Sequence, residues 1–404
     1  MKRKLLSLAA VAACAFAGSA QAQISDGIVK IGVLNDMSGL YSDITGPGSV
    51  TAAKMAVEDY IKASGSKLKV EIVSADHQNK PDVGSNVARQ WYDTDKVDMI
   101  ADVPTSSVGL AIAKISADKG KLHVNSGSAT ADLTGKACNA NTIHWAYDTW
   151  MLANGTGKAI VKSGGDTWFF LTADYAFGQA LERDTEAVVV KNGGKVVGKV
   201  RTPFPTQDFS SFLLQAQASK AKIIGLANAG GDTTNSIKQA AEFGITKGGQ
   251  NLAGLLVFLP DVHSLGLNIA QGLKLTETFY WDLNDNTRAF TKRFAAANGG
   301  KHPSMVQAGV YSSVIHYLKA VDAAKTDDGT KVAAKMKELP TDDPLFGKGT
   351  VRADGRKIHP AYLFEVKKPA ESKGPYDYYK LVATIPANEA FRPLAESECP
   401  LVKK

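Results

Sequence analysis

The 404-residue sequence predicts an α/β protein of two lobes, each built on a parallel sheet with helices on both faces. Segments of strand length alternate with segments of helical periodicity, and this β-α series runs along the chain twice. The chain is also too long for one compact core, because single cores stop growing at roughly 250–300 residues. Both observations favour two lobes of the same architecture.

The first 22 residues have the layout of a secretory signal peptide. A basic start at residues 1–4 precedes an apolar run over residues 5–17, and residues 20–22 (AQA) form a cleavage site before Gln23. We therefore expect a mature chain outside the cytoplasm. The sequence around Cys14 resembles the site at which bacterial lipoproteins are cut and acylated, but cleavage there would leave a very short apolar core, so this alternative ranks second.

The first β-α series lies within residues 23–147. Pro81 marks the start of one helix, and Ser64-Gly65 mark the end of another. The predicted strands are residues 29–34, 68–73, 99–103 and 122–124, with a strand-like piece at 142–145, and the predicted helices begin near residues 50, 83 and 108.

The second series starts after this piece, and its predicted strands are residues 168–171, 195–200, 222–226 and 252–257. Its predicted helices are residues 150–162, a helix that runs through residue 190, and residues 209–218 and 233–243. Residues 272–280 form a strand that leads back to the first lobe, where helices 287–297 and 305–324 pack. Past Pro340 come strands 349–352, 362–366 and 378–384, which we expect to be antiparallel. The expected division is residues 23–147 plus 276–350 for lobe 1, 148–275 plus 351–388 for lobe 2, and a tail at 389–404.

Charge and cysteine content restrict the possible functions. Loss of the leader removes three of the 47 basic residues, which leaves 44 − 40 = +4. This mild excess is spread along the chain, so we expect no nucleic-acid binding. No later stretch is apolar over the length that a bilayer requires. Cys138 and Cys399 remain in an oxidising compartment, and we expect a disulfide that pins the tail near the end of lobe 1, worth about 2–5 kcal/mol.

Residues with hydroxyl groups follow directly after two of the predicted strands. Residues 104–107 (PTSS) follow one strand, and residues 126–130 (SGSAT) follow the next. Ligands of open α/β sheets sit beyond the carboxyl ends of the strands, where helix N-termini bind anions. We interpret the two turns as a cradle for a carboxylate. The alternative is that Thr105 and Ser128 are only helix N-caps.

Five segments, taken in order, resemble the periplasmic solute-binding proteins of ABC importers of the branched-chain amino acid type. The resemblance covers nearly the whole mature chain and is carried by VKIGVLNDMSGLYSDITGPG, VPTSSVG, NSGSATADLT, LTADYAFGQAL and TQDFSSFLLQAQASKAKII. It implies a type I periplasmic binding fold, with two Rossmann-like lobes, three hinge crossings and a ligand held between lobes that close. It also implies an inner-membrane ABC permease as partner, and we expect a monomer.

The resemblance assigns roles to individual residues. In proteins of this family, two first-lobe turns hold the carboxylate of the ligand. They match Thr105, Ser106 and Ser107 in one segment and Ser128 and Thr130 in the other. The remaining candidates are an aromatic wall from lobe 1 and groups from lobe 2, namely Tyr41, Asp174, Tyr175, Phe177, Asn228, Phe258 and Asp261.

The ligand is where the sequence departs from the family pattern. Members that hold an α-amino group use an acidic side chain from lobe 2, but residues 257–261 (VFLPD) are apolar except for Asp261. A buried ammonium without a carboxylate would cost several kcal/mol. If Asp261 points away, the ligand is an aromatic carboxylic acid such as a benzoate or hydroxycinnamate derivative, whose flat ring suits Tyr41, Tyr175, Phe177 and Phe258. Aliphatic amino acids are the alternative.

Other function classes find little support. The sequence has no H-E-x-x-H, P-loop, G-x-S-x-G or C-x-x-C motif, and its seven histidines are scattered. The two S-x-x-K matches, at residues 64–67 and 219–222, lie in lysine-rich surface runs. We therefore expect no enzyme, metal or cofactor. A receptor sensor domain would need a following membrane helix, and a cytoplasmic regulator would lack the leader.

Overall fold

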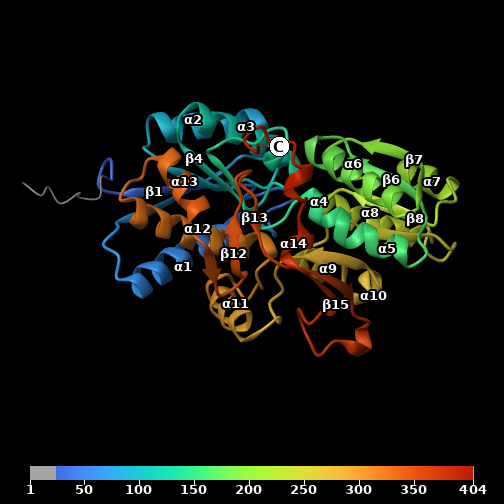
Figure 1. The fold of residues 1–404 in the computed structure, drawn as a ribbon. Helices are drawn as coiled ribbons and strands as arrows, with labels where there is room; N and C mark the ends of the chain where they lie inside the picture. Colours follow the sequence, from blue (N-terminus) through green and yellow to red (C-terminus); the bar gives the residue numbers. More distant parts are fainter. Residues whose placement is uncertain (1–23, 404) are drawn as a thin grey trace, which may run out of the picture.

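The computed structural model describes residues 24–403, so the predicted signal peptide and the alternative acylation at Cys14 lie outside the described residues. The described chain forms two α/β lobes side by side, with C-terminal segments between them (Figure 1). The predicted fold class is confirmed. Within residues 24–403, no helix has both the length and the apolar character that a membrane span requires.

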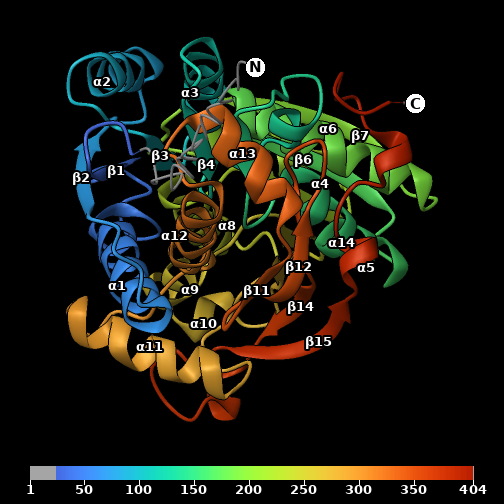
Figure 2. The same ribbon diagram turned by 60° about the vertical axis from the view of Figure 1, so that its left-hand side comes forward.

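The first lobe is built on a five-stranded parallel sheet in the order β2-β1-β3-β4-β5. Helices α1 and α12 pack together on one face, while α2 and α3 pack on the other (Figure 2). The strands are β1 (Val29–Asn35), β2 (Val70–Asp76), β3 (Met99–Asp102), β4 (Leu122–Asn125) and β5 (Thr142–His144). The helices are α1 (Gly46–Ser64), α2 (Pro81–Asp93), α3 (Ser106–Asp118), α11 (Asp285–Ala297), α12 (Met305–Ala324) and α13 (Gly329–Glu338).

The second lobe is built on a four-stranded parallel sheet in the order β7-β6-β8-β9. Its strands are β6 (Thr167–Ala173), β7 (Lys195–Thr202), β8 (Ile223–Ala227) and β9 (Asn251–Gly254). Its helices are α6 (Ala176–Lys191), α7 (Ser210–Ala218), α8 (Gly231–Glu242), α9 (Leu259–Leu265) and α10 (Leu267–Ala270).

The predicted helix at 150–162 is one helical stretch with a π turn in its middle. It consists of α4 (Thr149–Leu152), the π segment Ala153–Gly157 and α5 (Lys158–Lys162). The π segment passes close to β10 (Lys274–Glu277): a Cβ at Gly155 would lie 2.4 Å from the Thr276 hydroxyl oxygen. Glycine is therefore required where this helix meets the returning strand.

The later strands are antiparallel, as predicted. β10 pairs with β14 (Ala361–Val366), which pairs with β15 (Tyr379–Ile385). A second small sheet holds β11 (Thr341–Asp343), β12 (Gly347–Val351) and β13 (Lys357–Ile358). The short helices η1 (Ala131–Thr134), η3 (Pro369–Glu371), α14 (Ala387–Ala390) and η4 (Leu394–Glu396) complete the described chain.

The predicted disulfide joins Cys138 to Cys399, with 5.5 Å between their Cα atoms. Both cysteines are buried. The tail therefore ends against the first lobe, just beyond η1.

Candidate ligand-binding site

A narrow cavity lies between the two lobes. The turns after β1, β3 and β4 and helix α12 supply its first-lobe wall, and the turns after β6, β8 and β9 supply its second-lobe wall. It is lined by Tyr41, Ile44, Pro104, Gly127, Ala129, Tyr147, Tyr175, Phe177, Ala229, Leu256, Phe258 and Val306. The carboxyl ends of both parallel sheets thus meet at this cavity, which is where open α/β sheets bind ligands.

The lobes touch at two polar contacts beside the cavity. The Tyr41 and Tyr175 hydroxyls lie 2.5 Å apart, and the Gly231 N–H donates to the Leu40 carbonyl at 3.3 Å. Phe204 stacks on the Tyr175 ring, with 4.1 Å between centroids. Tyr41 and Tyr175 belong to different lobes, so this contact belongs to a closed arrangement of the two lobes.

The tyrosines in the cavity wall are neutral hydrogen-bonding groups. Burial raises the pKa of Tyr41 well above its usual value, and the neighbouring Tyr175 raises that pKa further. Burial likewise raises the pKa of Tyr147, whose hydroxyl donates to the Gly127 carbonyl at 2.6 Å. The Phe258 ring meets Tyr147 edge-on, at 5.9 Å between centroids. The wall therefore offers aromatic faces and uncharged phenols.

Thr105, Ser106, Ser128 and Thr130 of the predicted hydroxyl turns are buried, and the hydroxyl hydrogens of Thr105 and Ser128 are engaged within the protein. Thr105 donates to the Asn79 side-chain oxygen, and Ser128 donates to the Val103 carbonyl at 2.5 Å. The Ser106 hydroxyl oxygen accepts from the Thr130 N–H at 3.2 Å. Among the described residues, the cavity-lining parts of these turns are Pro104, Gly127 and Ala129, not the hydroxyl residues or the half-buried Ser107.

Neither Thr105 nor Ser128, the two residues of the alternative N-cap interpretation, makes a side-chain capping hydrogen bond within the described chain. Thr130 caps η1, since its hydroxyl oxygen accepts from the Asp132 N–H at 3.3 Å. Thr105 precedes α3, but its side chain makes no capping hydrogen bond within the described chain. The first N–H groups of α3 are consequently left uncapped by Thr105 at the edge of the cavity, where a helix N-terminus favours an anion.

Asn79 links two of the first-lobe loops. Its amide nitrogen donates to the Asp36 carboxylate at 2.7 Å, and its amide oxygen accepts from Thr105. The same carboxylate accepts the N–H groups of Gly39 at 2.6 Å and Tyr41 at 2.9 Å. The loop that carries Tyr41 is thereby joined to the turn that precedes α3.

Three second-lobe candidates lie outside the cavity lining. Asp174 is exposed and pairs with Arg201 at 3.4 Å. Asn228 is buried and accepts from the Thr233 hydroxyl at 2.7 Å. Asp261 is buried in the first turn of α9, where its carboxylate accepts from the Phe258 N–H at 2.9 Å. Burial raises the pKa of Asp261 to about 7.

The cavity wall is uncharged throughout the described chain: none of its lining residues is acidic or basic. Tyr41, Tyr175, Phe177 and Phe258 line it, as does Tyr147, which sequence analysis did not single out. The sequence pattern gave no signal for Leu256 and Val306, because an apolar residue after a strand or on a helix has the same pattern whether it packs in a core or faces a cavity. Within residues 24–403, no cluster of histidine, cysteine and acidic residues could hold a metal ion.

The family model of periplasmic binding proteins matches residues 28–374. The chain belongs to this family. A solved periplasmic binding protein from Burkholderia mallei is 52% identical, with a TM-score of 0.90, and the match covers 94% of this chain and 100% of that one. A branched-chain amino acid ABC transporter periplasmic ligand-binding protein from Burkholderia xenovorans LB400 is 42% identical, with a TM-score of 0.81, over 93% of this chain and 100% of that one.

More distant matches are named for a ligand or were solved with one bound. The Leu/Ile/Val-binding protein homolog 6 of Brucella melitensis is 24% identical over 89% of this chain and 93% of its own length. An ABC transporter solute binding protein from R. palustris, solved in complex with benzoate, is 21% identical, with a TM-score of 0.80, over 93% of this chain and 100% of that one. This periplasmic binding protein is therefore a substrate-binding component of an ABC importer.

Proposed function

We propose that this periplasmic binding protein captures a small aromatic carboxylic acid, such as a benzoate or hydroxycinnamate derivative, and delivers it to an inner-membrane permease. The mature chain would act in the periplasm after cleavage before Gln23. The uncharged, aromatic cavity between the lobes is the observation that carries the proposal.

The lining favours a ligand that has no ammonium group. A buried ammonium needs a carboxylate partner, because an unpaired buried charge costs several kcal/mol. Asp261, the acidic residue that the sequence offered for this role, caps α9 through Phe258 instead. Five aromatic rings line the cavity, and a flat ring can stack on them or meet them edge-on.

The ligand carboxylate would bind at the first-lobe edge of the cavity. Because the hydrogens of Thr105 and Ser128 are engaged, we assign this role to backbone N–H groups at the start of α3, with the hydroxyl residues holding the turns in place. An anion there also gains from the helix dipole. The benzoate bound by the R. palustris protein of the same fold supports a carboxylate of this class.

Capture would need no covalent chemistry. An open form exposes the first-lobe turns, and the ligand then gains second-lobe contacts with Tyr175, Phe177 and Phe258 only when the lobes close. The ligand therefore shifts the population toward the closed form, which also makes the Tyr41–Tyr175 contact. The permease would recognise this closed form.

A branched-chain or other aliphatic amino acid is the second candidate. The names of the B. xenovorans and Brucella proteins, which refer to branched-chain amino acids, favour it. An ammonium would then have to be met by tyrosine hydroxyls, by carbonyl groups or by Asp232, a buried acid of α8 whose charge raises the pKa of Tyr41 and Tyr175.

A thermal-shift comparison separates the two candidates. The ligands form two matched pairs, 3-phenylpropanoate with phenylalanine and 4-methylpentanoate with leucine, and each pair differs only by the ammonium; benzoate and 4-hydroxybenzoate complete the set. A ligand at 100 times its Kd stabilises the folded state by about 2.7 kcal/mol, so a micromolar binder raises Tm visibly. We expect shifts with the aromatic acids that lack the amine. A shift with leucine alone would contradict the proposal.

Leu256 provides a variant control in the same assay. Leu256→Glu places a carboxylate in the lining, so it should abolish the shift caused by benzoate through charge repulsion and desolvation. Leu256→Met keeps the size and polarity of the side chain and should retain the shift. Retention of the benzoate shift in Leu256→Glu would place the ligand elsewhere.

A further inference from the structure

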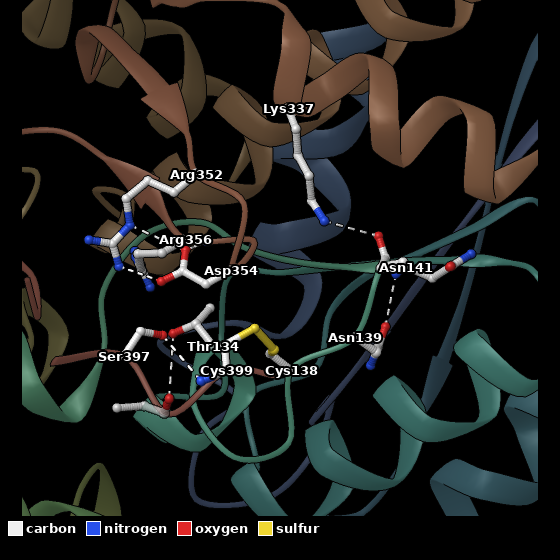
Figure 3. Close-up of a disulfide and its surroundings, with 12 residues drawn as sticks. Thr134, Cys138, Asn139, Asn141, Lys337, Arg352, Asp354, Arg356, Ser397 and Cys399 are labelled. Carbon is white, nitrogen blue, oxygen red and sulfur yellow. Dashed lines mark hydrogen bonds and ion pairs between the residues drawn. A yellow bond between two sulfur atoms is a disulfide. The ribbon is translucent and has the colours of Figure 1, made fainter. Parts of the chain in front are cut away.

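The C-terminal tail runs from the second lobe to the first. It leaves β15, and the Glu389 carbonyl in α14 accepts from the Asn154 side chain of the second lobe at 3.0 Å. It then reaches Cys399, which is bonded to Cys138 of the first lobe (Figure 3). Residues 390–398 are all that connects these two attachments.

The tail also packs on the segments that join the lobes. The Phe391 ring lies under the buried Arg356 guanidinium, at 4.2 Å, and the Arg392 carbonyl accepts from Arg352 at 2.7 Å. Arg356 in turn donates to the carbonyls of Trp145 at 2.6 Å and Tyr147 at 2.9 Å. The tail, the segment after β5 and the segment after β12 are therefore held together by one arginine pair.

Ion pairs bind the same region to both lobes. Arg392 lies 3.5 Å from Asp184 of α6 in the second lobe and 3.2 Å from Glu398 near the tail end. Arg183 of α6 lies 3.0 Å from Asp132 of η1 in the first lobe. A small cavity lies beside the tail, and Arg352, Asp354 and Ser397 are among its lining residues.

We propose that residues 386–399, closed by the Cys138–Cys399 disulfide, act as a strap that limits how far the two lobes open. Lobe opening moves α14 away from the first lobe, and a tail held only by hydrogen bonds and ion pairs would detach. The covalent bond prevents detachment, so opening must strip Phe391 and Arg392 from their contacts or stretch the strap. The strap thus excludes wide-open conformations, so the protein loses less conformational entropy when the lobes close.

The position of the anchor gives the strap a role in ligand retention. Cys138 follows η1, which itself follows the turn at residues 126–130 that contributes Gly127 and Ala129 to the ligand cavity. The strap therefore restrains the turn that faces the ligand against the second lobe. This inference rests on the proposed closure of the lobes around a ligand, but its primary test needs no ligand.

Two variants test the strap by small-angle X-ray scattering of the ligand-free mature protein. Cys138→Ser/Cys399→Ser removes the covalent bond. The second variant keeps the disulfide but adds eight Gly/Ser residues after Pro393, which lengthens the strap. We expect both variants to have a larger radius of gyration and a larger maximum dimension than the wild type. The lengthened variant keeps the proposal testable if the double variant fails to fold.

A matched control places the same eight-residue insertion after Lys247, in an exposed turn of the second lobe. Its scattering should differ from that of the wild type only by the added mass. If the radius of gyration and maximum dimension of the lengthened variant match those of this control, the disulfide only holds the tail in place and the proposal is wrong. A missing thermal shift with aromatic acids would instead contradict the proposed ligand, and would leave the scattering result unaffected.

In a second measurement, an aromatic acid that shifts the wild-type Tm is titrated into each variant. We expect a several-fold higher Kd for the lengthened and double variants and an unchanged Kd for the control. An unchanged Kd in the lengthened variant would show that the strap does not restrain closure.

Discussion

Asn79 acts on the site without lining the cavity. Its amide accepts from Thr105 and donates to Asp36, which holds the loop of Tyr41. The orientation of Tyr41 against Tyr175 therefore depends on a side chain from the turn after β2. A polar residue of this kind contributes through geometry, because each hydrogen bond fixes one loop relative to the next.

Asn79→Ala should weaken ligand binding about 5–30-fold, because loss of one buried hydrogen-bond partner costs about 1–2 kcal/mol. Isothermal titration with the ligand that shifts the wild-type Tm measures this change. Asn235→Ala is the control, since Asn235 donates only to Gln207 on the exposed side of α8 within the described chain. Equal Kd values for the two variants would contradict the role of Asn79.

Asp261 should make stability depend on pH. Burial raises its folded-state pKa to about 7, above the ordinary value of 3.8, so the folded protein holds a proton that the unfolded chain has released. This contribution is fully present below pH 3.8 and is lost as pH rises to about 7. Relative to Asp261→Asn, the wild type should therefore have a lower free energy of unfolding at pH 7.5 than at pH 4.5.

Urea unfolding of both proteins at the two pH values measures this difference. The buried His77, whose pKa burial lowers to about 4, changes stability in the opposite direction but is common to both proteins and cancels. A pH-independent difference between the wild type and Asp261→Asn would show that Asp261 is ionised in the folded state.

At the scale of elements, the two turns of the first lobe form one unit. The Asp102 carbonyl accepts the N–H groups of Ser126 at 3.2 Å and Gly127 at 3.1 Å. Ser128 donates to Val103, which has a positive φ of 58°. The ends of β3 and β4 are thereby joined directly behind the residues that line the cavity, so a displacement of one turn moves the other.

Gly127→Ala should disturb both turns. A Cβ at this position would lie 2.5 Å from the Pro104 Cα, a backbone atom that cannot move alone. Overpacking of this kind costs about 1–3 kcal/mol. Chemical unfolding should show the loss of stability, and the thermal shift with benzoate should shrink. The control is Ala129→Gly, which removes a methyl group from the cavity lining without a clash and should keep most of the stability. Gly164→Ala would be a poor control, because Gly164 has a positive φ that strains any other residue.

At the scale of the whole molecule, the disulfide closes most of the chain into one loop. Cys138 and Cys399 are 261 residues apart, and a cross-link between distant residues restricts the unfolded chain strongly. Cys138→Ser/Cys399→Ser should therefore lose about 2–5 kcal/mol of stability. Urea unfolding under oxidising conditions measures the loss. A reducing agent should produce a similar change in the wild type and none in the variant.

Much of the architecture could be predicted from local patterns. Alternating apolar segments predicted both parallel sheets, and the pairing of Cys138 with Cys399 followed from the presence of two cysteines in an oxidising compartment. The predicted strand at 252–257 is shorter in the structure, as β9 ends at Gly254 and residues 255–258 turn toward the cavity. A run of apolar residues does not by itself show where a strand ends.

The sequence by itself determined the two α/β lobes, the antiparallel C-terminal strands, the disulfide and the strand ends at which a ligand could bind, because periodicity and turn residues act over a few neighbours. Only the tertiary structure decided that Thr105 donates to Asn79 and that Asp261 caps α9. It also decided that Leu256 and Val306 face the cavity between the lobes and that the tail crosses between the lobes. These outcomes depend on contacts between residues far apart in the chain, and a buried side chain has the same local pattern whether it meets a core, a backbone group or a cavity.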